Sequence, residues 1–131
     1  MKNRYLCKAK RTDNGEWVIG GLVRYGFTGR EKYYIVPSYA SDLYALGIDP
    51  STICRCTGLK DKNGKLIWEN DIVNCLTEEC CGYISWNESE AGFYFNVLLE
   101  DGRFEEENIY DYQDCIEVIG NTFDNPELLE V

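Results

Sequence analysis

Cysteines are the first residues to consider for chemistry, because the chain contains seven of them and no histidine. The lack of histidine excludes a histidine-based catalytic triad and a histidine-containing zinc site. Cys54 and Cys56, followed by Cys75 and the pair Cys80 and Cys81, could supply four thiolates to zinc. Their spacing differs from the knuckles of structural zinc sites, so we expect free or core-packed thiols and neither a metal nor another cofactor.

Carboxylates are frequent but form no catalytic pattern. They cluster at residues 78–79, 88–90 and 105–107. General acid–base catalysis needs two carboxylates held at a set separation around a cleft, whereas acids this frequent in loops are typical of a solvated surface. The sequence contains no phosphate-binding glycine-rich loop and no calcium-loop pattern. We therefore predict no catalytic residues, with an enzyme of unknown type as an alternative.

Charge is distributed unevenly along the chain. The net charge is −10, yet residues 1–65 contain twelve basic and six acidic residues, whereas residues 66–131 contain only Arg103 against seventeen acids. The acidic half predicts a non-enzymatic module that binds a basic host or phage protein, with Glu105, Glu106 and Glu107 at the edge of the binding surface. In one version, the protein is an acidic decoy that occupies the DNA-binding surface of a host protein.

The basic half leaves two other hypotheses open. The first is weak nucleic-acid binding, although the net charge of −10 argues against nucleic acid as the main partner. Its candidate residues are all basic: Lys8, Lys10, Arg11, Lys60, Lys62 and Lys65. The second is a homo-oligomer that assembles through the complementary halves. If the two charge sets interleave in space, they simply neutralise each other within the monomer.

Aromatic residues add weight to a binding surface. The chain has ten tyrosines, five phenylalanines and three tryptophans, more than one small core has to bury. Tyrosine is common at interfaces because its ring buries apolar area while its hydroxyl stays hydrogen-bonded. Ordinary half-exposed strand tyrosines are the alternative explanation.

The elements that must position these residues are mostly strands. The length of 131 residues suits a single domain, either undivided or made of two subdomains at residues 1–56 and 57–131. Asn-Gly turns predict hairpins that pair residues 4–10 with 17–23 and 57–59 with 66–68. These two hairpins are either related repeats or two generic Asn-Gly hairpins. A third hairpin is expected to pair residues 81–86 with 92–99.

Further strands are expected at residues 33–36, 71–76 and 116–119, and short helical turns at residues 41–46 and 125–129. The expected fold class is mainly β, with antiparallel hairpins and a small SH3-like barrel in the C-terminal half. No signal-peptide core and no apolar stretch of membrane-spanning length is present, so we expect a cytoplasmic protein without membrane contact.

Residues 57–73, which read TGLKDKNGKLIWENDIV, resemble a motif of the YopX family. Residues 10–18 and 118–128 extend the resemblance over nearly the whole chain. Asn70 stands where the family usually has glycine, and asparagine also tolerates a left-handed turn. The resemblance implies a small β-rich phage or prophage protein that acts inside a bacterial cell. It carries over no catalytic residue, because the family has no established activity.

Overall fold

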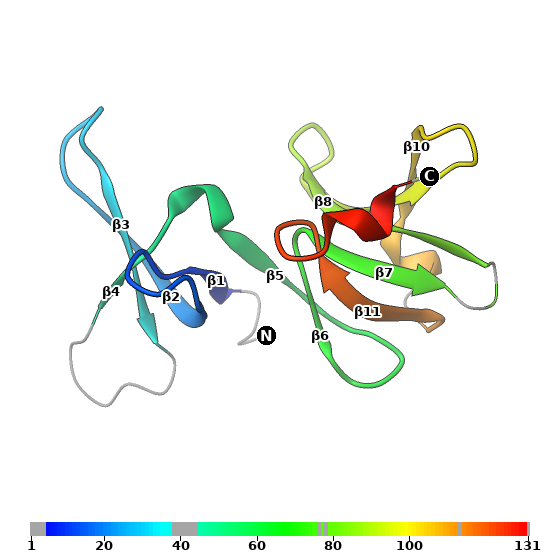
Figure 1. Cartoon of the computed structure of the whole chain (residues 1–131), viewed down its shortest axis with the longest axis horizontal. Coiled ribbons are helices and arrows are strands. Elements are labelled where there is room, and N and C mark those ends of the chain that lie inside the picture. Colours follow the sequence, from blue (N-terminus) through cyan, green and yellow to red (C-terminus); the bar gives the residue numbers. More distant parts are fainter. Residues whose placement is uncertain (1–4, 38–44, 76, 78, 113, 131) are drawn as a thin grey trace. The chain divides into compact units, whose positions relative to one another are not determined.

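The computed structural model describes residues 5–37, 45–75, 77, 79–112 and 114–130, which are mostly β-strand (Figure 1). The mainly β fold class predicted from the sequence is confirmed. The chain divides into two compact units, residues 1–56 and 57–131. No helix among the described residues is long and apolar enough to cross a membrane. A barrel of the SH3-like kind stays a prediction.

Unit 1 is an antiparallel sheet with the strand order β4-β3-β2-β1-β5. Its strands are β1 (Cys7–Lys10), β2 (Trp17–Tyr25), β3 (Lys32–Pro37), β4 (Leu46–Gly47) and the start of β5 (Cys54–Lys60). The 3-10 helix η2 (Pro50–Thr52) precedes β5. The core consists of apolar side chains from these elements: Ala9, Val18, Ile35, Leu46 and Ile48. The first predicted hairpin is present, with Lys10 opposite Trp17 and Cys7 opposite Gly20.

The helical turn expected at residues 41–46 lies largely outside the described residues. The prediction is wrong for Leu46, which begins β4 and pairs with Ile35 of β3. Leu46 is buried in the core of unit 1, and this burial outweighs its helix propensity.

The hairpin of β2 and β3 extends beyond the core of unit 1. We call residues 21–32 the arm, and every residue from 21 to 30 is exposed (Figure 1). Its tip is an ordered turn, in which the Arg30 amide donates to the Phe27 carbonyl over 2.8 Å. Gly26 is required there, because its φ is +117° and a Cβ would lie 2.6 Å from the Arg30 carbonyl oxygen.

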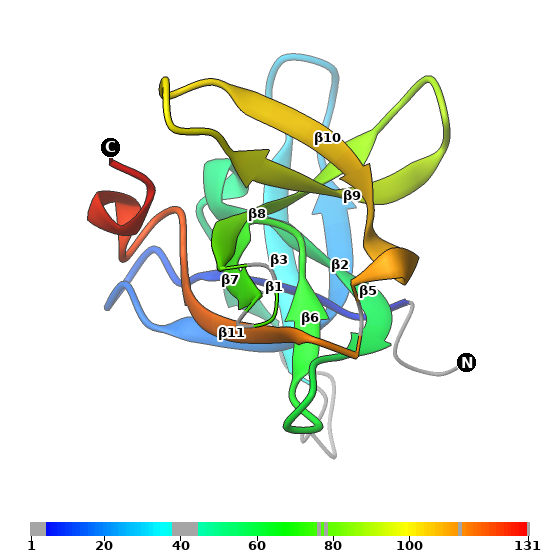
Figure 2. The same cartoon turned by 90° about the vertical axis from the view of Figure 1, so that its right-hand side faces the viewer.

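Unit 2 contains a five-stranded antiparallel sheet with the order β10-β9-β8-β7-β11 (Figure 2). The strands are β7 (Asp71–Cys75), β8 (Cys80–Asn87), β9 (Gly92–Leu98), β10 (Phe104–Asn108) and β11 (Ile116–Asn121), and the end of β5 neighbours β6 (Leu66–Trp68). The core gathers residues from most of these elements: Ile67, Val73, Cys75, Ile84, Phe95, Ile109 and Ile116. The predicted pairing of residues 81–86 with 92–99 is confirmed.

Two details of unit 2 differ from the expectations. Strand β10 was not expected, because a run of three glutamates has little β propensity; its pairing with β9 fixes it as a strand. The expected C-terminal helix is a 3-10 helix, η4 (Pro126–Leu129), and Asn125 does not cap it. Instead, the Asn125 Oδ1 accepts from the Asn121 amide over 3.2 Å.

Candidate functional site

The segment that carries the family resemblance, residues 57–73, is a hairpin with a buried interior and an exposed turn at residues 62–65, which we call the motif hairpin. Thr57 accepts from the Leu59 amide over 3.1 Å and donates to the Ile67 carbonyl over 2.7 Å. Ile67 and Trp68 are 0% and 5% exposed. These side chains are occupied by contacts that hold the hairpin together, so none of them is offered to a ligand.

Asp61 closes the turn of the motif hairpin. Its Oδ1 accepts from the amides of Asn63 and Lys65, each over 2.9 Å, and its Oδ2 accepts from the Val118 amide of β11 over 3.0 Å. Burial alone would raise the pKa of this carboxyl, but the three backbone donors outweigh it and hold the pKa below its ordinary value. Asp61 is therefore an ionised structural group that ties the turn to β11.

The next turn, between β6 and β7, explains why residue 70 must tolerate a left-handed conformation. Asn70 has a φ of +71°, so the left-handed conformation expected from the resemblance is present. Asp71 is 2% exposed and its Oδ2 accepts from the Trp68 amide over 2.8 Å. The buried polar groups of the motif are therefore used within the fold.

Three of the seven cysteines lie in the interior and the other four are half-buried. Cys54, Cys56 and Cys75 are buried, and the Sγ atoms of Cys75 and Cys115 lie 2.8 Å apart. Within the described part of the chain, no group of three or more cysteine or carboxylate side chains could hold a metal ion.

The six predicted basic residues are divided between the two units. Lys8 and Lys10 lie on β1, where their Nζ atoms stand 4.9 and 5.4 Å from the centre of the Trp17 ring. Arg11 binds Asp13 through two hydrogen bonds of 2.9 and 2.6 Å, and the bond to Arg11 lowers the pKa of Asp13. The other three, Lys60, Lys62 and Lys65, belong to unit 2. The Lys62 Nζ lies 3.7 Å from the Glu117 Oε2.

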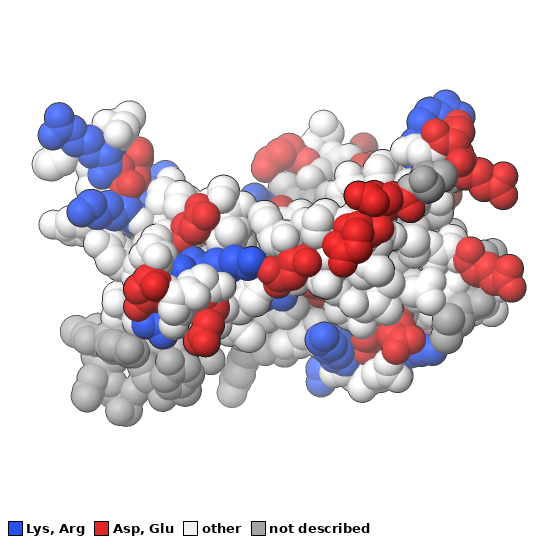
Figure 3. Space-filling model, viewed as in Figure 1, with Lys and Arg blue, Asp and Glu red and all other residues white. Residues whose placement is uncertain are grey.

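The charge asymmetry follows the division into units. Residues 1–56 contain nine basic and five acidic residues, whereas residues 57–131 contain four basic and eighteen acidic ones. In Figure 3, basic side chains gather over the tip of the β2–β3 hairpin, and acidic ones spread over the strands of unit 2. Unit 1 therefore carries basic and acidic side chains mixed together with a basic excess, whereas unit 2 is strongly acidic.

Glu105, Glu106 and Glu107 lie side by side along β10, at one end of the strand order of unit 2. Among the described residues, none of the three has an ion pair. Both carboxylate oxygens of Glu106 accept from the Asn87 amide group, over 3.0 and 3.2 Å, which fixes the carboxylate in place. Side chains alternate along a strand, so Glu105 and Glu107 point to one face of β10 and Glu106 to the other. That these acids form a binding edge stays a prediction.

Two exposed aromatic side chains, Phe104 and Tyr110, lie before and after these acids in the chain. The Phe104 ring is 41% exposed and packs edge-on against Tyr83, with ring centres 5.0 Å apart. Beyond the strand, Tyr110 is 68% exposed beside the exposed Asp111. We call Phe104, the three glutamates, Tyr110 and Asp111 the acidic edge. The signal that could have identified it is a run of acids between two aromatic residues, in the sequence FEEENIYD of residues 104–111.

The fold and these surfaces define a small all-β protein. The motif at residues 57–73 stabilises its fold, and the acidic edge and the arm lie on its surface. The family model described as YopX protein matches residues 8–130, so the chain belongs to the YopX family. No curated protein matches the chain.

Proposed function

We propose that this protein is a phage or prophage accessory protein that binds a basic macromolecule, a host or phage protein, through the acidic edge of unit 2. The single observation that carries the proposal is the row of three adjacent glutamates on an edge strand, without ion pairs among the described residues. An edge strand also has unpaired backbone groups with which a partner segment can hydrogen-bond.

Several features make the acidic edge more than a solvated charge run. Phe104 and Tyr110 offer exposed apolar area beside the carboxylates, and aromatic anchors surrounded by charge are typical of interfaces. The Asn87 contact holds Glu106 in one orientation, which reduces the side-chain entropy lost on binding. Unit 2 as a whole is strongly acidic, which accelerates the approach of a basic partner and repels an acidic one.

The test compares two variants that remove the same charge. E105Q/E106Q/E107Q neutralises the acidic edge, whereas E79Q/E88Q/E90Q neutralises three exposed acids elsewhere in unit 2. Each variant and the wild type are immobilised, exposed to lysate of the bacterial host, and the bound proteins are identified; the recovered partner is then purified and its Kd measured.

We expect a basic protein whose affinity falls about tenfold or more in the edge variant and less than threefold in the control, because close charge pairs at an interface contribute about 1.5 kcal/mol or more. Recovery of the same proteins by all three baits, or of acidic partners alone, would overturn the proposal.

A further inference from the structure

The outer face of the sheet in unit 1 carries aromatic and apolar side chains that its core does not use. Side chains alternate along β2, so residues 17, 19, 23 and 25 lie on the face opposite to the buried Val18. Tyr25 is 72% exposed, Val23 43% and Ile19 41%. The register places Tyr34 of β3 opposite Val23, and thus on the same face. Packing within the unit leaves this surface uncovered.

Cations stand beside the aromatic rings of this face. The register sets Lys10 opposite Trp17 and Lys32 opposite Tyr25, and both lysines of β1 reach the Trp17 ring. Arg30 lies at the tip of the arm, next to the turn that holds Phe27. Neither Arg30 nor Lys32 forms an ion pair within the part of the chain that the structure describes. These two charges are therefore available to an anion.

A groove of about 370 Å³ lies at the border of this face, and Tyr34, Lys32, Glu31, Thr12 and Ile48 are among its lining residues. Its volume is at the small end of the range for ligand pockets. The Glu31 carboxylate accepts from the Gly29 amide over 3.1 Å, which fixes its orientation. A carboxylate beside an aromatic ring suits the amino group of a nucleobase, and the neighbouring lysine suits a phosphate.

We infer that the outer face of unit 1 binds single-stranded nucleic acid, with bases stacked on Tyr25 and Tyr34 and phosphates beside Lys8, Lys10 and Lys32. Exposed aromatics on a sheet, interleaved with cations, are how proteins hold unpaired strands. Trp17 and Tyr25 are eight residues apart on one strand, about 26 Å, which is enough for several nucleotides. A duplex hides its bases and offers this face no stacking partner.

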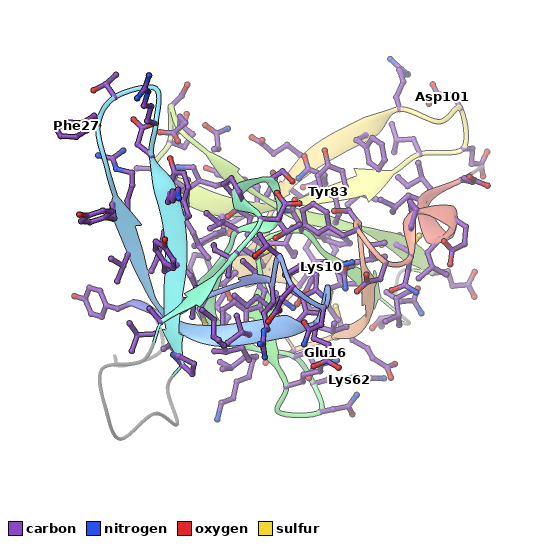
Figure 4. The ribbon with its side chains drawn as sticks, turned by 60° about the vertical axis from the view of Figure 1, so that its left-hand side comes forward. Lys10, Glu16, Phe27, Lys62, Tyr83 and Asp101 are labelled. Atoms are coloured by element: carbon purple, nitrogen blue, oxygen red, sulfur yellow. The ribbon has the colours of Figure 1, made fainter. Side chains whose placement is uncertain are left out.

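The arm shapes the end of this surface. Figure 4 shows Phe27 at the far end of the arm with its ring directed outward, and the ring is 84% exposed. The turn that holds it is closed by the hydrogen bond from Arg30. Phe27 and Arg30 therefore extend the aromatic and basic character of the face to the tip. This inference goes beyond the proposed function and uses a different unit of the chain.

The experiment measures fluorescence anisotropy of labelled 12-nucleotide single strands of DNA and of RNA, and of the DNA duplex, with the full-length protein in 50 and 200 mM salt. We expect the single strands to bind at 50 mM salt, to bind at least threefold more weakly at 200 mM, and to bind more tightly than the duplex. The DNA and RNA arms decide which nucleic acid is preferred.

Point variants distinguish binding through base stacking from binding through non-specific electrostatic attraction. Y25A should weaken binding about fivefold or more, because stacking of a base on an aromatic ring contributes at least about this factor, and Y25F should restore it. Y110A removes a similarly exposed tyrosine of unit 2, 68% against 72%, and should change nothing. K32Q should weaken binding, whereas K60Q should not.

Three results would overturn the inference. The first is the absence of binding to every single strand at 50 mM salt, and the second is equal binding by Y25A and Y110A. The third is self-association, measured by sedimentation, that depends on Tyr25 while no oligonucleotide binds, which would assign the face to a second copy of the chain. E105Q/E106Q/E107Q should bind oligonucleotides no more weakly than the wild type, so failure of this inference is distinguishable from failure of the proposed function.

Discussion

The β2–β3 hairpin and the motif hairpin are both antiparallel hairpins, but they place their side chains in opposite environments. In the motif hairpin, Asp61 and Ile67 are 6% and 0% exposed, and the carboxylate is saturated by backbone donors. In the arm, Tyr25 and Phe27 are 72% and 84% exposed. The comparison teaches that the residues of the family motif hold the fold, whereas the exposed aromatic residues of unit 1 lie in the other hairpin.

The largest expected difference between the hairpins is in the stability lost when an apolar side chain is truncated to alanine. Ile67→Ala should lower the free energy of unfolding by about 2–5 kcal/mol, because it leaves a cavity in the core of unit 2. Ile19→Ala, on the exposed face of β2, should cost less than about 1 kcal/mol. Urea unfolding followed by tryptophan fluorescence measures both, and similar losses would contradict the contrast.

The second prediction concerns the buried carboxylate. Asp61→Asn should cost about 2 kcal/mol at pH 7, because the amide turns a donor toward one of the three backbone N–H groups. Since the folded pKa of Asp61 lies below its ordinary value of 3.8, its contribution is complete above that pH and is lost as the pH falls through the folded value.

Urea unfolding between pH 7 and pH 2.5 checks this linkage. The wild type should lose more stability below about pH 4 than Asp61→Asn does. Asp114→Asn, at an exposed position of the same unit, serves as the control and should follow the wild type. Parallel curves for the wild type and Asp61→Asn would show that Asp61 is not ionised through its backbone donors.

A smaller effect is expected at the left-handed turn of the motif hairpin. Asn70→Ala should destabilise the protein by about 1 kcal/mol, because the φ of +71° is strained for alanine. Asn70→Gly, the residue usual in the family, should be neutral or slightly stabilising. Thermal unfolding of the three proteins gives the order, and a more stable alanine variant would disprove the role of the turn.

The smallest effect is expected at the tip of the arm. Phe27→Ala should change the free energy of unfolding by no more than about 0.5 kcal/mol, because the ring is 84% exposed. The same denaturation experiment tests it. A loss of more than 1 kcal/mol would show that Phe27 is packed in solution. The arm tip would then not be part of the proposed binding surface.

The local pattern of the chain was enough to predict the three hairpins. Asn14-Gly15 and Asn63-Gly64 specify tight turns, and alternation of apolar residues specifies the strands on either side. Strands β4 and β10 could not be predicted in this way. Leu46–Gly47 is too short to show alternation, and the glutamates of β10 are held as a strand only by the partner strand β9.

The candidate surfaces were predictable only in part. The sequence indicated that Glu105, Glu106 and Glu107 lie together, because neighbours in a chain stay neighbours. It also combined Lys8, Lys10 and Arg11 with Lys60, Lys62 and Lys65, which belong to a different unit, and Arg11 is occupied by Asp13. The exposed aromatics of β2 were missed, because exposure of a strand face depends on what packs against it.

The sequence by itself determined the β character, the turns, the family and the opposite charges of the two halves, since each depends on residue type or on neighbours a few positions apart. The tertiary structure decided which side chains are occupied and which are available. Asp61 is bound to Val118, 57 positions along the chain, and Tyr25 is left uncovered because the core lies on the other face of its strand. Such contacts between distant residues are set by the packing of strands, which no local pattern records.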